Sequence, residues 1–206
     1  MEKERIVVVG LIIIFLMFLS LYLDADIIKI VSLMRSELAD DFFIIGITLV
    51  SSGVIIFFFL TSLFLWQENK RKWIFPLWFS LFLSAAVSFL LKIIIQRQRP
   101  FQLGIVSTLP VLESASQTIW NFSFPSFQAM LAFSAVPILS KEFPKFKKVW
   151  VIFAVLVAFS RVYFGLHFLS DALAGSLIGY LIGWFVIKTE KETKFWERIY
   201  KGIFRK

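Results

Sequence analysis

Long apolar stretches separated by short polar segments dominate this chain. Six of them stand out, and they lie at 6–23, 42–66, 73–95, 126–140, 149–166 and 168–187. A helix needs about 20 mostly apolar residues to cross the hydrocarbon core of a bilayer. The pattern therefore predicts an all-α fold, an integral membrane bundle of about six transmembrane helices. We expect one membrane-embedded domain over residues 1–206.

Two of these stretches need a closer reading. The first runs from Ile6 to Leu23, and an acidic Asp-Ala-Asp segment follows it where a signal peptide would have a small-residue cleavage site. We interpret it as a retained membrane helix. The fourth stretch is short, so it can span the bilayer only if its helix begins near Pro125 and continues toward Phe143.

Two connections on one side of the predicted bundle are longer than a tight link requires. Residues 24–41 contain an amphipathic run from Ile27 to Leu38, which favours a helix lying at the membrane interface. Residues 101–125 form the longest irregular stretch, and apolar side chains such as Trp120 occur in it. Long loops are often binding loops, so we predict a substrate loop that lies on the membrane.

Three glycines recur at every fourth position of the last apolar stretch, at Gly175, Gly179 and Gly183. Small residues at this spacing allow two helices to pack closely. Packing within the chain is the simpler interpretation, and dimerisation through this stripe is the alternative.

Basic residues are divided unequally between the two sides of the predicted bundle. Of the 22 Lys and Arg residues, sixteen fall on the side that holds both chain ends and the connections at 70–72 and 141–148. Cytoplasmic loops carry the excess of positive charge. We therefore expect an integral protein of the cell membrane with both termini in the cytoplasm.

Composition excludes several kinds of chemistry. The chain has no cysteine and one histidine, His167, so disulfides, thiolate metal sites and multi-histidine metal sites are excluded. We expect no metal and no cofactor. The net charge is +8, and the basic residues cluster in short segments beside the apolar stretches. This placement suits anionic lipid headgroups and argues against a nucleic-acid partner.

Polar and ionisable residues gather where the apolar stretches meet the outer side. They are Lys92, Arg99, Ser126, Arg161, His167 and Asp171. Ionisable groups at membrane depth are costly, so they commonly mark a functional site. The alternative is that each Lys or Arg only extends its charged end to the headgroups. That explanation suits one residue better than a set gathered on one side.

The cationic members of this set are suited to binding phosphate. Lys92, Arg99 and Arg161 supply charged donors, and the arginine fork matches phosphate oxygens. Pro125 has the character of a first-turn proline. The backbone N–H groups of Ser126 and Phe127 would then point at an anion from a helix N-terminus.

The remaining two residues are suited to attack on the phosphate. His167 and Asp171 are four positions apart, so they share one face of a helix. The carboxylate can accept a hydrogen bond from one ring nitrogen and leave the other nitrogen as the nucleophile. A structural hydrogen bond is the alternative for this pair alone, and the neighbouring cations favour catalysis.

These residues also form a recognisable set of motifs. The three motifs are Lys92-x6-Arg99-Pro100, Pro125-Ser126 and Ser160-Arg161-x5-His167-x3-Asp171. Their order and spacing resemble the signature of the type 2 phosphatidic acid phosphatase and vanadium haloperoxidase superfamily, in its membrane lipid-phosphate phosphatase branch. The resemblance implies that His167 attacks phosphorus to give a phosphohistidine and that Asp171 orients it. The three cations and Ser126 would bind the phosphoryl oxygens.

The middle motif departs from the family pattern. The family usually has Pro-Ser-Gly-His, whereas this chain has Phe127 and Gln128 in place of the glycine and histidine. The family's histidine is the general acid, and an amide cannot transfer a proton at neutral pH. The chain is then a slow enzyme, a specialised one or none. Another group could also supply the proton, and the candidates are Lys92, Glu113 and Tyr163.

The leading hypothesis is a membrane phosphatase that hydrolyses a lipid phosphate or diphosphate from the extracytoplasmic face. Within this class an isoprenoid diphosphate is favoured over a phosphatidic-acid-like monophosphate, because its leaving group is a weak base. The alternative is an impaired protein that binds or transports a lipid phosphate, and haloperoxidase chemistry ranks last. The expected partners are the lipid substrate and the bilayer, and the sequence does not indicate an oligomeric state.

Overall fold

The computed structural model describes residues 2–49, 51–115 and 121–204, and these residues contain helices and no strand. The elements are α1 Glu2–Ser32, α2 Glu37–Asp41, the π-helix η1 Phe42–Leu49, α3 Gly53–Trp66, the 3₁₀-helix η2 Glu68–Trp73, α4 Ile74–Ile95, α5 Pro110–Ala115, α6 Phe127–Glu142, the 3₁₀-helix η3 Pro144–Phe146, α7 Lys147–Tyr163, α8 Leu169–Thr193 and α9 Phe195–Phe204. All six predicted stretches are helical, so the predicted all-α bundle is confirmed.

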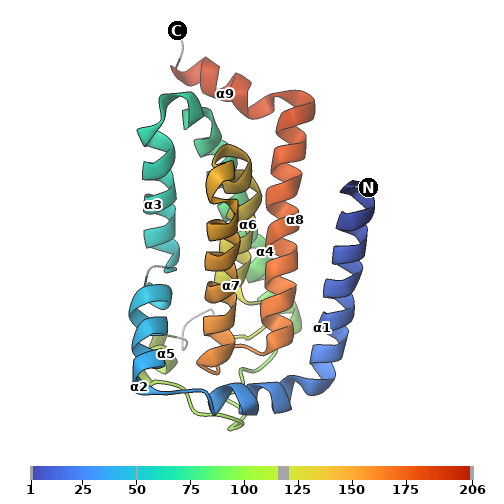
Figure 1. Ribbon diagram of the computed structural model, residues 1–206, viewed down its shortest axis with the longest axis vertical. Coiled ribbons are helices and arrows are strands. Elements are labelled where there is room, and N and C mark those ends of the chain that lie inside the picture. The colour runs from blue at the N-terminus through green and yellow to red at the C-terminus, as the bar shows by residue number, and fades with distance from the viewer. Residues whose placement is uncertain (1, 50, 116–120, 205–206) are drawn as a thin grey trace.

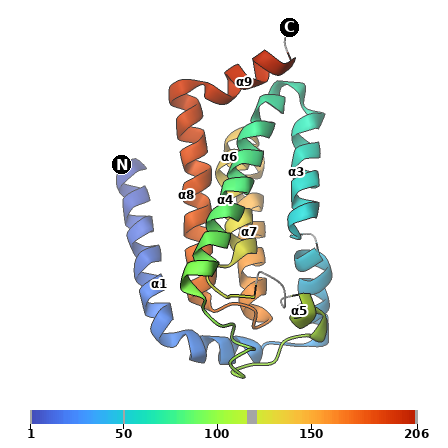
Figure 2. The same ribbon diagram turned by 180° about the vertical axis from the view of Figure 1, so that it is seen from behind.

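The long helices run side by side along the long axis of the molecule. Helices α4, α6, α7 and α8 form the centre, while α1 and α3 flank it on opposite sides (Figures 1 and 2). Helix α9 lies across one end. The connection before α5 lies at the other end, together with the start of α8. The two ends therefore differ in which segments close them.

The length and hydropathy of the helices fit a membrane protein. In the described ranges, Glu68–Ile95 and Leu169–Thr193 are long and apolar enough to cross a bilayer. Glu37–Leu49 and Gly53–Trp66 would make a third span if counted together, although they meet at a 60° bend. The predicted stretch 42–66 is therefore two helices rather than one. Helices α6 and α7 have 16 and 17 residues, so each is about 25 Å long.

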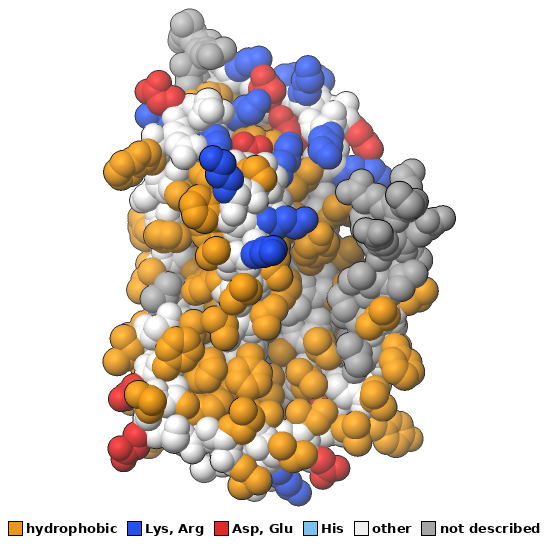
Figure 3. All heavy atoms as spheres, in the orientation of Figure 1, with side chains coloured by type: hydrophobic (Ala, Val, Ile, Leu, Met, Phe, Trp, Pro, Cys, Tyr) orange, Lys and Arg blue, Asp and Glu red, His pale blue; other side chains and the backbone are white. Residues whose placement is uncertain are grey.

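The outer surface of the bundle is apolar over its middle. Large hydrophobic side chains cover this zone in Figure 3, and charged side chains gather toward the ends. Three large hydrophobic side chains of α3 and α4, Phe58, Phe82 and Val54, are exposed by 65%, 73% and 67%. Such a continuous apolar surface would be unfavourable in water and is the expected surface of a bundle surrounded by lipid.

The glycine stripe of α8 packs against the backbone of α6. A Cβ atom on Gly179 would lie 2.2 Å from the Met130 carbonyl oxygen. One on Gly183 would lie 2.2 Å from the Ser134 carbonyl oxygen. Larger residues would force the two helices apart. The predicted packing within the chain is therefore confirmed, and it fixes the start of α8 beside the start of α6.

The two long connections lie at the same end of the bundle. Helix α1 continues to Ser32, and its last turns bend and run beneath the bundle toward α2 (Figure 1). The predicted interfacial helix is therefore the end of α1 rather than a separate element. The predicted loop 101–125 contains α5, and its residues 116–120, which include Trp120, lie outside the described residues.

Candidate active site

Lys92 enters the bundle because it continues a buried polar stripe of α4. Ser80, Ser84, Ser88 and Lys92 recur at every fourth position, and all four are buried. Residues at this spacing share one helix face. The side chain of Lys92 is 1% exposed, and its Nζ donates to the Phe122 carbonyl oxygen at 2.5 Å. A helix face that packs inward thus carries the ammonium group to the loop before α6.

Arg161 is buried at the end of α7 for a similar reason. Its face of the helix also carries Ala154 and Val157, which are buried in the bundle. The guanidinium Nη2 donates to Thr48 Oγ1 at 2.7 Å, and Nε donates to Ser160 Oγ at 3.1 Å. Among the described residues, no carboxylate lies within ion-pair distance of Arg161 or Lys92. Both cations are therefore bound by neutral oxygens and can still neutralise an anion.

Arg99 and His167 are in direct contact. Arg99 Nη1 lies 3.2 Å from His167 Nε2 and donates to the Leu166 carbonyl oxygen at 2.8 Å. Its Nε donates to the backbone carbonyl oxygen of Asn121 at 3.1 Å. Both side chains are almost fully buried, at 6% and 2% exposed. A phosphate bound by this guanidinium would therefore lie beside the imidazole.

The neighbours of His167 select one tautomer. Nδ1 lies 2.6 Å from the Ser123 carbonyl oxygen, which can only accept, so Nδ1 carries the proton. Nε2 is then unprotonated, and its lone pair accepts from Arg99 Nη1 at 3.2 Å. Burial, followed by the positive charges of Arg99 and Lys92, lowers the pKa of His167 well below 6.5. The imidazole is therefore neutral at neutral pH, as a nucleophile must be.

Burial also lowers the pKa of Arg99, to about 10, while the negative charge of Asp171 opposes this shift. Arg99 therefore stays charged at neutral pH. Within the described ranges, no group of three or more His, Asp or Glu residues could hold a metal ion. The donors gathered here are cationic, and they suit an anionic ligand.

Asp171 does not bind His167 directly, which corrects the sequence-based expectation. Its Oδ2 lies 4.0 Å from His167 Nδ1, too far for a hydrogen bond. Oδ2 instead accepts from Ser123 Oγ at 2.5 Å and from the Phe168 N–H at 2.9 Å. Oδ1 accepts from Arg97 Nη1 at 2.7 Å. Among the described residues, Ser123 is the one that binds both the Asp171 carboxylate and the imidazole.

The N-terminus of α6 also differs from expectation. The helix begins at Phe127, so Pro125 lies before it and is not a first-turn residue. The Ser126 N–H is not available to an anion, because it donates to the Asp171 carbonyl oxygen at 3.1 Å. The Ser126 hydroxyl is different: Oγ is buried and has no hydrogen-bond partner among the described residues. A hydroxyl in that condition fits a phosphate oxygen as its partner.

The two residues that depart from the family pattern open α6. Phe127 and Gln128 are both half-buried. In the described part of the chain, the Gln128 side chain makes no hydrogen bond, so its amide is not committed to another group. Tyr163, one of the alternative proton donors, does have a partner, because its hydroxyl donates to Asp40 Oδ1 at 2.7 Å.

Sequence reasoning missed three residues of this region, namely Asp24, Arg97 and Ser123. Arg97 joins the buried carboxylates of Asp24 and Asp171, at 2.8 and 2.7 Å. Asp24 carried a usable signal, because it is an acidic residue at the end of a long apolar stretch. Arg97 and Ser123 carried none, since polar residues beside a loop are ordinary.

Taken as a class, this is a helical membrane protein with a buried, neutral imidazole among three buried cations, beside a hydroxyl that has no hydrogen-bond partner in the described ranges. The family model described as "PAP2 superfamily" matches residues 73–194, which include every residue of the predicted site. The chain belongs to the PAP2 superfamily, and it is an integral membrane protein.

Two of the curated relatives that the chain resembles are lipid phosphatases by name. An undecaprenyl-diphosphatase of Sulfolobus acidocaldarius is 30% identical over 134 residues, which is 64% of this chain and 62% of the relative. A phosphatidylglycerophosphatase B of Bacillus subtilis is 42% identical over 79 residues, which is 33% of this chain and 38% of the relative. The chain thus covers less than two thirds of the length of either protein.

Two solved structures have a similar fold. A transmembrane PAP2-type phosphatidylglycerolphosphate phosphatase from Bacillus subtilis aligns with a TM-score of 0.70 and 24% identity, over 91% of this chain and 97% of that chain. Aquifex aeolicus LpxE aligns with a TM-score of 0.63 and 27% identity, over 81% of this chain and 95% of that chain. The likeness extends beyond residues 73–194 to most of the bundle.

Proposed function

We propose that this protein is a membrane phosphatase that removes phosphate from a lipid diphosphate or monophosphate through a phosphohistidine on His167. The observation that carries the proposal is the contact between His167 Nε2 and Arg99 at 3.2 Å, with Nδ1 held by a carbonyl oxygen. The unprotonated nitrogen thus faces the guanidinium, and a phosphoryl group bound by Arg99 in place of this contact would meet the lone pair of Nε2.

The reaction would take two steps. In the first, Nε2 forms a bond to the terminal phosphorus while the bond from phosphorus to the leaving oxygen breaks. In the second, water attacks the same phosphorus, the bond to Nε2 breaks, and the electron pair returns to the imidazole. The water protons go to the departing phosphate and to solvent. Arg99, Lys92, Arg161 and the Ser126 hydroxyl would bind the oxygens whose negative charge persists throughout.

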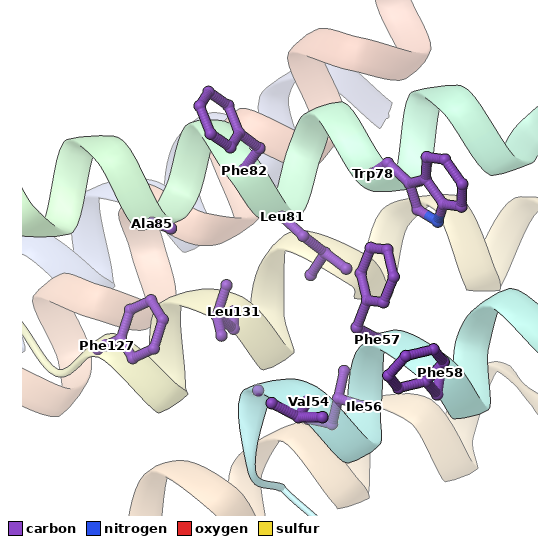
Figure 4. A pocket seen from close by; sticks show the side chains of 11 residues that line it. Val54, Ile56, Phe57, Phe58, Trp78, Leu81, Phe82, Ala85, Phe127 and Leu131 are labelled. Atoms are coloured by element: carbon purple, nitrogen blue, oxygen red, sulfur yellow. The ribbon is translucent and has the colours of Figure 1, made fainter.

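An apolar groove beside the site supports a lipid substrate. It has a volume of about 350 Å³ and lies between α3, α4 and the start of α6. Figure 4 shows Phe57 and Trp78 at one part of its lining and Phe127 at another. Because Phe127 directly follows Ser126, a hydrocarbon chain in the groove would leave its phosphate near the Ser126 hydroxyl. We assign the groove to the substrate chain.

A diphosphate is the favoured substrate, because Gln128 cannot protonate a leaving group. An alkoxide leaving group needs that proton, whereas a phosphate monoester is a far weaker base and needs it least. The relative from Sulfolobus acidocaldarius is named for an isoprenoid diphosphate, which is consistent with this choice. Within this class we propose an isoprenoid diphosphate.

Gln128 also favours a second candidate function. A protein that binds or transports a lipid phosphate without hydrolysing it needs the cations but no general acid, and Gln128 fits that description. The oriented imidazole argues against this candidate, because binding alone requires neither a fixed tautomer nor a nucleophile.

We further propose that the site faces the extracytoplasmic side and that both termini are cytoplasmic. Lys and Arg side chains gather over the end that carries α9 (Figure 3), opposite the end where α8 begins. The positive-inside rule places such an end in the cytoplasm. Since the chain has no cysteine, single cysteines at positions 71 and 112 can test this. An impermeant thiol reagent on intact cells should label position 112 only, and labelling of 71 alone would reverse the orientation.

The decisive experiment is phosphate release by the purified protein from matched pairs of lipid monophosphates and diphosphates with the same chain. We expect a higher kcat/KM for the diphosphate of each pair. A variant with His167→Ala serves as the blank for contaminating phosphatases. Binding of these lipids by the wild type without any phosphate release would favour the non-catalytic candidate.

A further inference from the structure

One further feature is a bridge through Arg97 between two buried carboxylates, which come from helices far apart in the chain. Arg97 Nη2 donates to Asp24 Oδ2 at 2.8 Å, and Arg97 Nη1 donates to Asp171 Oδ1 at 2.7 Å. The two carboxylate side chains are 4% and 0% exposed. One guanidinium therefore links α1 to the start of α8.

Asp24 is bound on both of its oxygens. Oδ1 accepts from the Ser170 N–H at 3.1 Å, and Oδ2 accepts from the Ser170 hydroxyl as well as from Arg97. Ser170 directly precedes Asp171. Asp24 therefore binds the backbone at the start of α8 in addition to the Arg97 guanidinium. Asp24 also lies outside the residues 73–194 that the family model matches. The N-terminal helix thus contributes to the hydrogen bonds around Asp171.

The bridge fixes Asp171 in one orientation. With Oδ1 held by Arg97, Oδ2 is left for Ser123 Oγ and the Phe168 N–H. Ser123 is bound at both ends, since its hydroxyl donates to Asp171 and its carbonyl oxygen accepts from His167 Nδ1. A continuous series of hydrogen bonds therefore runs from Asp24 through Arg97, Asp171 and Ser123 to the imidazole.

We propose that Asp24, Arg97 and Ser123 are positioning residues, and that Asp171 acts on His167 through Ser123 rather than by direct contact. This proposal rests on the proposed function of His167 as the nucleophile. The hydroxyl of Ser123 holds its own residue in place, and the carbonyl oxygen then fixes the proton on Nδ1. The bridge keeps Asp171 from turning away from Ser123.

A purely structural role is the competing explanation, because the same contacts also fasten α1 to the bundle. A buried ion pair is weak evidence for stability, since apolar residues of similar volume often serve as well. The two explanations differ in what they predict for a folded variant. Fastening predicts an unchanged imidazole, whereas positioning predicts a change in its tautomer and in kcat.

The single histidine makes the tautomer directly measurable. Protein labelled with ¹⁵N-histidine, with any purification tag removed, gives signals from one imidazole alone, and NMR separates its protonated and unprotonated ring nitrogens. The variants are Asp24→Asn, which removes the negative charge and one acceptor oxygen that face Arg97 and Ser170, and Ser123→Ala, which removes the hydroxyl that donates to Asp171. The matched control is Asp26→Asn, which changes an exposed carboxylate on the same helix.

We expect the wild type and Asp26→Asn to carry the proton on Nδ1, and both test variants to lose this preference. Misplacement of a reacting group costs up to about 100-fold in rate, so kcat should fall by about 10- to 100-fold in both. The inhibition constant of inorganic phosphate should change by less than about threefold, because the cations that bind it remain. Arg97→Lys, which keeps the charge but not the fork, should give an intermediate kcat.

The proposal is overturned if folded Asp24→Asn and Ser123→Ala keep both the wild-type tautomer and a kcat within about twofold. Should Asp24→Asn fail to fold, Ser123→Ala decides the question, because it leaves the attachment of α1 intact. If the wild type hydrolyses no lipid phosphate, the proposed function fails. The tautomer measurement would still decide whether the series of hydrogen bonds orients His167.

Discussion

The two ends of the helical bundle both carry many charged side chains but hold them in different ways. At the site end, Lys92, Arg99 and Arg161 are 1%, 6% and 3% exposed, and each donates to a specific oxygen. At the end that carries α9, charges are solvated, as in the Arg71–Glu68 pair at 3.4 Å, whose side chains are 39% and 84% exposed. Burial with fixed geometry therefore marks the site, whereas the number of cations does not.

The largest expected effect lies at the site end. His167→Ala should lower kcat by at least roughly a thousandfold, because it removes the proposed nucleophile. Binding of orthovanadate should largely survive, since the cations are unchanged. Steady-state phosphate release and an equilibrium binding assay measure the two effects. Activity within a few-fold of the wild type would remove His167 as the nucleophile.

One glycine near each end of the bundle allows the packing of the two ends to be compared. A Cβ on Gly175 would lie 2.5 Å from the Ser126 carbonyl oxygen, while nothing lies within 4 Å of one on Gly202. Gly175→Ala should therefore cost about 1–3 kcal/mol of stability through overpacking and should lower turnover by displacing Ser126. Gly202→Ala should be neutral or slightly stabilising. Thermal unfolding in detergent tests this pair, and equal losses in both variants would contradict it.

Substitutions at the N-terminus of α6 should increase the turnover of lipid monophosphates. Gln128→His combined with Phe127→Gly should raise lipid monophosphate turnover by at least roughly tenfold, because the imidazole can protonate the leaving oxygen. Diphosphate turnover should rise less, unless hydrolysis of the phosphohistidine limits it. Phe127→Gly alone is the control. If the wild type already hydrolyses monophosphates as fast as the double variant, another residue supplies the proton.

The depressed pKa of His167 gives a pH signature with a definite sign. The neutral imidazole is reactive, so the acidic limb of kcat/KM should lie below pH 6.5. Below this value the unfolded chain binds a proton that the folded chain does not. Stability should therefore fall as the pH drops from about 6.5 toward the folded pKa. Arg99→Gln removes a nearby positive charge and should raise the pKa of His167, which an NMR titration measures. Arg71→Gln should leave this pKa unchanged.

The smallest effect is expected at the end that carries α9. Lys72 pairs with Glu197 at 3.5 Å, with side chains 39% and 24% exposed. Exposed pairs of this kind contribute about 0–1 kcal/mol. Lys72→Gln should therefore shift the unfolding temperature little and leave kcat unchanged. A loss of turnover in this variant would mean that the two ends are coupled.

Sequence reasoning predicted which polar residues gather at one end of the bundle, but it did not predict the contacts between them. Lys92, Arg99, Arg161 and His167 could be found because ionisable residues at the ends of apolar stretches are rare and costly. The spacing of His167 and Asp171 indicated a shared helix face, yet Asp171 lies just inside α8 and His167 just before it. A four-residue spacing brings side chains together only within a continuous helix, which explains why the direct hydrogen bond does not form.

The bridge through Arg97 could not have been predicted from spacing. Asp24 and Arg97 are 73 positions apart, and Arg97 and Asp171 are 74 apart. Such contacts depend on how α1, α4 and α8 pack, and that packing follows from features such as the glycine stripe. Periodicity indicates which face of a helix is buried, but it does not identify the residue on the neighbouring helix.

The groove between α3 and α4 also determines how the protein should be assayed. Val54, Phe58 and Phe82 line it and are exposed on the apolar surface of the bundle, so the groove opens sideways rather than toward water. A lipid would then reach it by lateral diffusion within one leaflet. The concentration that governs saturation would be the mole fraction of substrate in the membrane or micelle. KM expressed as a mole fraction of substrate should stay constant when inert detergent dilutes the surface. KM expressed as a bulk concentration should rise.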